Sequence, residues 1–191
     1  MQLVERGEIL GLKEYEDVRP HFRARVIALK KQRRLALGPN VTLVFENHDT
    51  VLLQVQEMLR TERISNESAI QHEIDTYNDL IAKPGHLSAT AMIEYPDPAQ
   101  RDAMLEKLVG VETKFFVEFA GERCFSESDL RTVKAERTTA VHYLRFPLSE
   151  SVRSALQAQA SGVAVGIDHA AYQARVELDR TALASLAEDL E

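Results

Sequence analysis

The chain has 191 residues, of which 45% are hydrophobic and 28% charged, and its formal net charge is −7 at pH 7. These fractions are near the averages of folded globular proteins, which excludes extended disorder, and the length suffices to bury a core, so we expect one domain over residues 1–191. The acidic balance disfavours general nucleic-acid binding, and no apolar run approaches the roughly 20 residues of a membrane span.

The N-terminal end and the cysteine content bear on the compartment. The first eight residues contain acids where a secretory signal needs a basic start and an apolar run, so export is not expected. A lone cysteine, Cys124, cannot form an internal disulfide, which suits a reducing environment. We therefore expect a cytoplasmic protein.

The N-terminal half predicts three helices and one strand. The first helix spans residues 15–37, and Pro20 requires its regular part to begin near that residue. Residues 41–46 are rich in β-branched side chains and predict a strand. Two further helices follow, one capped near Asn47 and running to about residue 63, the other capped at Ser65-Asn66 and ending before Pro84. We expect these two to form a hairpin.

The second half changes to the period of strands. Strands are predicted near residues 87–95, 115–119, 139–146, 163–167 and 172–178, with helices near 99–108, 149–160 and 181–190. The polar segment 121–138 predicts a long loop with at most one helical turn, and we expect it to be the most mobile part. The fold class is α+β, with N-terminal helices packed on a mostly antiparallel sheet and additional C-terminal helices.

Four charged residues occupy positions that the helical period assigns to the interior. At about 100° per residue, Glu62 falls among apolar residues of the second helix, Glu73 among those of the third, and Arg25 and Arg33 on or beside the apolar stripe of the first. A buried carboxylate needs a cation, hydrogen bonds or a metal. One interpretation is a buried network in which these arginines neutralise the two acids.

The other interpretation is a metal site. Carboxylates that project from facing helices, Glu62 and Glu73, resemble half of a carboxylate-bridged site for iron, manganese or zinc. Such sites usually need more carboxylates and a Glu-x-x-His pair, which the adjacent His72 does not provide. His142 on a predicted strand and His169 at a strand end would add metal ligands or an acid–base pair if they meet.

The same histidines have ordinary structural interpretations. His142 shares a face with Leu144 and Phe146 and fits a hydrogen-bonded core residue, and Asp168-His169 fits a turn. A nucleophilic Cys124 would need a positioned base that the sequence does not indicate. Glycine-rich phosphate loops, paired-cysteine metal motifs and nucleophile elbows are absent from the sequence. An enzyme assembled from residues distant in sequence stays open.

Three segments, residues 19–27 (RPHFRARVI), 56–64 (QEMLRTERI) and 140–146 (AVHYLRF), resemble an uncharacterised bacterial family catalogued as a domain of unknown function. The resemblance extends over nearly the whole chain. It implies genes that neighbour those of rubrerythrin-like proteins and an iron–sulfur oxidoreductase, and hence a role in redox or peroxide metabolism. Two hypotheses follow: a non-catalytic accessory protein that docks on such a redox partner, or a small metal-dependent oxidoreductase or hydrolase that uses the buried carboxylates and histidine.

Overall fold

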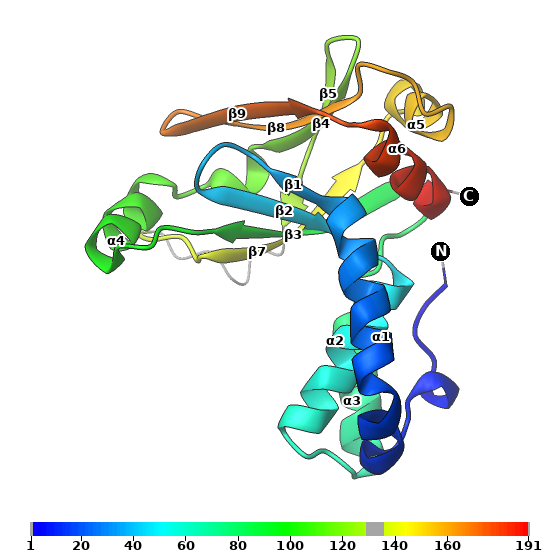
Figure 1. The fold of residues 1–191 in the computed structure, drawn as a ribbon. Coiled ribbons are helices and arrows are strands. Elements are labelled where there is room, and N and C mark those ends of the chain that lie inside the picture. The colour runs from blue at the N-terminus through cyan, green and yellow to red at the C-terminus, as the bar shows by residue number, and fades with distance from the viewer. Residues whose placement is uncertain (1, 129–135, 191) are drawn as a thin grey trace.

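The computed structural model describes residues 2–128 and 136–190, which form a β-sandwich and a helical arm that projects from it (Figure 1). The two sheets of the sandwich are antiparallel throughout, so the predicted α+β class with a mostly antiparallel sheet arrangement is confirmed. Within the described residues, no helix combines the length and apolar character that crossing a membrane requires.

Sheet A faces the arm with its outer side. Its strands, in spatial order, are β1 (Arg34–Ala36), β2 (Val41–Phe45), β3 (His86–Ile93), β7 (Val141–Pro147) and β6 (Glu127–Ser128). The register pairs Val44 with Thr90 and Thr90 with Tyr143. Because side chains alternate along a strand, these residues share the outer face, and their neighbours Phe45 and Leu144 point into the sandwich.

Sheet B closes the other side of the sandwich. Its strands, in spatial order, are β5 (Glu122–Phe125), β4 (Phe115–Phe119), β8 (Ala164–His169) and β9 (Tyr172–Glu177). Phe115 and Val165 of sheet B share one apolar core with Phe45 and Leu144 of sheet A. On the opposite face, Gly166 leaves no room for a side chain, because a Cβ there would lie 2.4 Å from Cζ of Phe116.

Short helices close the two ends of the sandwich. At one end lies α4 (Pro98–Lys107), and at the other lie α5 and α6 (Figure 1). The bounds of the remaining elements at these ends are α5 (Glu150–Gln157), α6 (Arg180–Ala187), and the 3-10 turns η2 (Val111–Thr113) and η4 (Glu188–Leu190). The predicted C-terminal helices are thus confirmed.

The arm consists of three helices with their own apolar cluster. They are α1 (Leu12–Arg33), α2 (His48–Thr61) and α3 (Glu67–Asn78), preceded by the 3-10 turn η1 (Arg6–Glu8). Asn47 and Asn66 cap α2 and α3 with their side chains, as predicted. The two helices pack as the expected hairpin around Val55, Leu59 and Ile74.

Two predicted elements differ from the structure. The first helix begins at Leu12 and contains Pro20 eight residues later, and it ends at Arg33, where strand β1 starts. Proline removes the amide that would bond the Glu16 carbonyl, but both residues are exposed, so water can satisfy that carbonyl. The predicted loop 121–138 contains strands β5 and β6, while its residues 129–135 lie outside the described part of the chain.

Candidate functional site

A groove of about 980 Å³ lies in the corner between the arm and the outer face of sheet A, and we call it the corner groove. Strand β7 contributes Val141 and Tyr143, whose exposures of 44% and 49% are high for apolar and aromatic residues. Met58, Tyr77 and Leu80 line it from the side of the arm. The groove therefore presents aromatic and apolar surface from two different parts of the fold.

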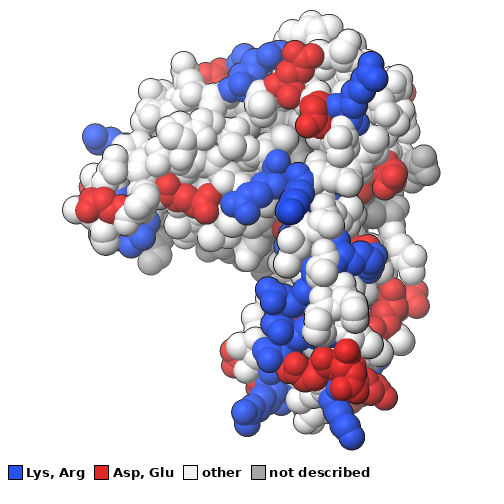
Figure 2. All heavy atoms as spheres, viewed as in Figure 1, with Lys and Arg blue, Asp and Glu red and all other residues white. Residues whose placement is uncertain are grey.

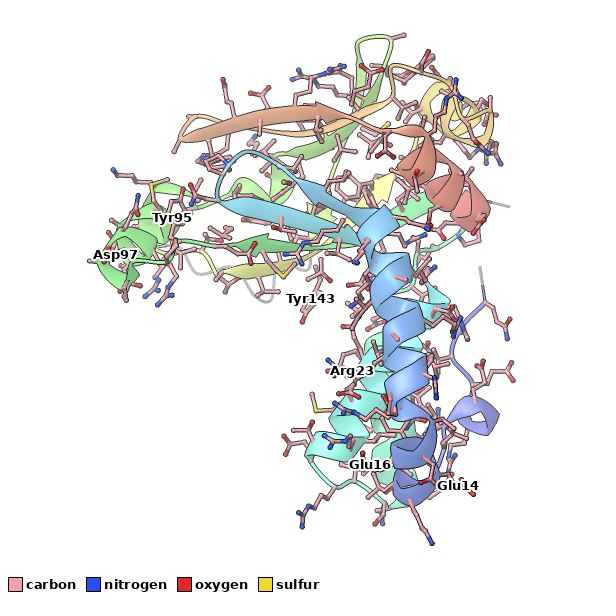
Figure 3. The ribbon with its side chains drawn as sticks, in the orientation of Figure 1. Glu14, Glu16, Arg23, Tyr95, Asp97 and Tyr143 are labelled. Carbon is pink, nitrogen blue, oxygen red and sulfur yellow. The ribbon has the colours of Figure 1, made fainter. Side chains whose placement is uncertain are left out.

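The alternation along β7 explains how the sequence builds the sheet side of this groove. His142, Leu144 and Phe146 are buried, so the intervening Val141 and Tyr143 face outwards. Figure 3 shows Tyr143 pointing from the sheet into the angle between the sandwich and the arm. Apolar side chains on an outer sheet face are unusual in a protein with a complete core, which makes this surface a candidate for binding.

Several polar side chains of the corner groove donate hydrogen bonds to backbone carbonyls, among them Thr76, Ser88 and Thr139. Burial raises the pKa of Tyr77, to which the neighbouring Tyr143 and Glu73 contribute, so its phenol remains neutral and able to donate a hydrogen bond. Arg145 donates from Nη2 to the carbonyl of Asp79 at 3.2 Å. Among the described residues, neither Arg145 nor Lys83 of this groove has a carboxylate within ion-pair distance.

The two predicted acids do not converge. Glu73 is half-buried and lines the corner groove, but Glu62 is exposed at the C-cap of α2. The projection that placed Glu62 inside assumed that the helix continues to residue 63, whereas α2 ends at Thr61 and Arg63 has a φ of 53°. The predicted burial of Glu62 is therefore wrong.

The two predicted arginines also differ from each other. Arg25 is exposed, and its guanidinium pairs with Asp49 instead of Glu62 or Glu73, so its predicted burial is wrong as well. The buried face of α1 is lined by Tyr15, Val26 and Arg33, and this face is rotated away from Arg25. Burying Arg25 as well would require a further helix packed over its side of α1, and no described helix covers it.

Arg33 is 1% exposed and joins three parts of the molecule. Its Nε donates to the carbonyl of Phe45 at 2.9 Å and its Nη1 to the carbonyl of Ser185 at 2.9 Å. Its guanidinium also pairs with Asp189. Burial raises the pKa of this carboxyl above its ordinary value, although the positive charge of Arg33 opposes that shift. We call this set the Arg33 clamp, because it ties the end of α1 to strand β2 and to the C-terminal helices.

The predicted histidines lie in different sheets. His142 is 3% exposed on β7 of sheet A, and burial lowers the pKa of its imidazole. Its Nε2 is 3.2 Å from the hydroxyl of Thr138, while its Nδ1 has no hydrogen-bond partner among the described residues. His169 ends β8 of sheet B, where Nδ1 accepts from the amide of Ala171 in a turn. The two imidazoles are not brought together.

Sequence reasoning did not single out several buried carboxylates, among them Glu112 and Glu46. Glu112, 3% exposed, lies near His142 and has an Oε2 without a partner in the described residues. Glu46, also 3% exposed, accepts hydrogen bonds from Thr50, Gln54 and Thr90. Glu46 continues the alternation of β2 beyond Val44, so it lies on the outer face of sheet A, and this alternation could have predicted that position from the sequence. Within residues 2–128 and 136–190, no group of three or more His, Cys, Asp or Glu could hold a metal ion.

The fold and the corner groove define an α+β protein with an amphipathic surface groove between a helical arm and a sheet. A family model described as protein of unknown function (DUF3501) matches residues 3–190, and the chain belongs to this family. Among solved structures, the chain is similar to a protein of unknown function from Burkholderia pseudomallei K96243, with 37% identity, a TM-score of 0.92 and coverage of 100% of both chains. No curated protein matches the chain.

Proposed function

We propose that this protein is a non-catalytic accessory protein of redox or peroxide metabolism in the cytoplasm, and that it binds its partner protein in the corner groove. The observation that carries this proposal is the exposed pair Val141 and Tyr143 on the outer face of sheet A. Tyrosine and arginine are enriched at the centres of protein interfaces, because each combines a large contact area with a polar group. Both types line this groove.

The shape of the groove favours an extended segment of a partner. Its volume of about 980 Å³ is at the upper end of the range of ligand pockets, and it is bounded by a sheet on one side and by helices on the other. Tyr77 and Tyr143 offer aromatic surface, and Glu73, Lys83 and Arg145 offer charges of both signs at the rim. A peptide with apolar side chains and a polar backbone matches this mixture better than a purely apolar ligand.

The partner class comes from the family resemblance, which implies rubrerythrin-like and iron–sulfur proteins as gene neighbours. The test is a calorimetric titration of this protein with each of those two proteins from the same organism. We expect binding at micromolar concentrations or tighter, and Tyr143→Ser should weaken it at least about tenfold, as loss of a central aromatic residue does.

The control is Phe125→Ser, which removes a comparably exposed aromatic side chain, at 42%, from strand β5. A second matched pair is Val141→Ser against Val18→Ser, with exposures of 44% and 43%. Loss of affinity only in the groove variants supports the proposal. Absence of binding to both proteins, or equal losses in both members of each pair, would overturn it.

A further inference from the structure

Helix α1 concentrates positive charge in an acidic protein. Residues 12–34 carry eight of the 23 Lys and Arg of the chain but only three of its 30 Asp and Glu. Figure 2 shows Lys and Arg where the arm meets the sandwich and along the side of the arm below it, with acidic residues gathered towards the free end. Helix α1 therefore carries a net positive charge in a chain that is acidic as a whole.

Part of this charge forms a stripe on one side of α1, which we call the arm stripe: Arg23, Ile27, Lys30 and Arg34. Arg23, Ile27 and Lys30 recur at intervals of four and three, so they share one side of α1, and Arg34 follows directly after the helix as the first residue of β1. Figure 3 shows Arg23 extending from α1 on the side over which the sandwich projects. The stripe thus runs up the concave side of the corner and reaches sheet A at strand β1.

The arginines on the other sides of α1 are paired, whereas Arg23 and Lys30 of the stripe are not, within the residues that the structure describes. Arg19 binds Glu57, Arg25 binds Asp49, and Arg33 binds Asp189. Within the described part of the chain, Arg23 and Lys30 have no carboxylate within 4.0 Å, and Arg34 reaches Glu94 only at 3.9 Å. The positive charge of the stripe is therefore available to a binding partner.

An exposed apolar residue lies in the middle of the stripe. Ile27 is 46% exposed between Arg23 and Lys30. A solvated helix face gains nothing from an isoleucine there, but a protein interface combines an apolar centre with a charged rim. Complementary charge at such a rim accelerates association and orients the partner.

We infer that the arm stripe is a docking surface for the acidic surface of a protein partner and orients that partner towards the corner groove. This inference rests on the proposed function in its choice of a protein as the occupant. Nucleic acid fits less well, because no aromatic residue interleaves with the stripe to stack bases. A flat bilayer cannot follow the concave side of the corner.

The test uses a double charge reversal, Arg23→Glu with Lys30→Glu. Its matched control is Lys107→Glu with Lys114→Glu, two exposed lysines at the α4 end of the sandwich, which changes the net charge equally. A milder pair, Arg23→Gln with Lys30→Gln, covers the case in which the reversal perturbs the arm, and circular dichroism checks the fold of each variant.

The first measurement is independent of the redox partner. Fluorescence anisotropy follows binding of a labelled polyglutamate peptide at low salt and at physiological ionic strength. We expect the stripe reversal to weaken binding about tenfold at low salt, with a smaller effect at higher salt, because exposed charges are screened over about 8 Å under physiological conditions. Equal weakening in the control pair, or no peptide binding by the wild type, would overturn the inference.

The second measurement separates the stripe from the groove. With the redox partner, the stripe reversal should slow association about tenfold and leave dissociation nearly unchanged, whereas Tyr143→Ser should mainly accelerate dissociation. If the peptide binds through the stripe but the redox proteins do not bind at all, the proposed function fails and the stripe remains. Tighter binding of duplex DNA or of anionic phosphatidylglycerol vesicles than of the peptide at physiological salt refutes a protein occupant.

Discussion

The sandwich and the arm differ in what fills their interiors. The sandwich core is built from apolar side chains of two sheets and of the helices at its ends, including Phe45, Phe115 and Phe146. The arm has a smaller apolar cluster, and polar contacts border it, such as that of the Tyr15 hydroxyl, which donates to Glu57 at 2.7 Å. We therefore expect substitutions that disturb packing to act most strongly on the sandwich, and the titration of Glu57 to act on the arm.

We expect the largest effect from a substitution that breaks the connection between the arm and the sandwich. Arg33→Met removes the Arg33 clamp and leaves Asp189 buried without a cation, so we expect a loss of about 3–5 kcal/mol in the free energy of unfolding. Urea unfolding followed by circular dichroism measures it. Lys31→Met, on the neighbouring exposed residue, is the control and should change stability by less than about 0.5 kcal/mol. A similar loss in both variants would contradict the clamp.

A smaller effect should be confined to the sandwich. In Gly166→Ala, the new Cβ would lie 2.4 Å from Phe116 Cζ and 2.5 Å from the carbonyl oxygen of Ala174, which is backbone and cannot swing away. We expect a destabilisation of about 1–3 kcal/mol from overpacking. Gly7→Ala, with no atom within 4 Å of its Cβ, is the control. Hydrogen exchange should show faster opening of sheet B and little change in the arm; the reverse pattern would argue against the separation of the two regions.

The smallest expected effect is a loss of stability of the arm at low pH. Hydrogen bonds from Arg19 hold the pKa of Glu57 at about 2, well below the value of 4.5 for a free side chain. The folded-state pKa is depressed, so this contact stabilises fully above pH 4.5 and the contribution is lost as the pH falls from 4.5 towards 2. Glu57 is 28% exposed, so the loss should stay below about 1 kcal/mol.

Hydrogen exchange at pH 3 and pH 7 checks this expectation in α1 and α2. We expect protection of these helices to fall at low pH relative to the sandwich, after correction for the intrinsic exchange rate. Glu57→Gln should reduce that relative difference, because the substituted amide does not titrate. If Glu57→Gln lost as much protection in α1 and α2 at pH 3 as the wild type, other carboxylates would be responsible for the loss.

Local sequence signals predicted most elements because each signal has a local physical cause. Asn47 and Asn66 cap their helices through contacts within three residues, and the alternation along β7 follows from strand geometry. The site was less predictable because it depends on which elements meet. The sequence pattern placed Arg33 beside the buried side of its helix, but it could not identify its partners. Ser185 and Asp189 lie 152 and 156 residues away in the sequence.

The errors at the site have related causes. Helical projection places a residue on a face, but it does not say which face another element covers, so Arg25 was assigned to the interior although it lies exposed. It also assumes that the helix continues, and Glu62 lies beyond the end of α2. Tyr143 was not singled out, although the face assigned to His142, Leu144 and Phe146 already placed it on the opposite side of its strand. Tyr143 is exposed because only one face of sheet A packs against sheet B. Which face that is depends on the arrangement of all the strands and cannot be predicted from β7 alone.

The Arg33 clamp also has a consequence for the order in which the chain is made. The ribosome completes α1 long before Ser185 and Asp189, which bind the guanidinium of Arg33 from positions more than 150 residues later. Until those residues emerge, a growing chain that packs this arginine against β2 leaves several of its N–H groups without acceptors. Final docking of α1 should therefore wait for the end of synthesis.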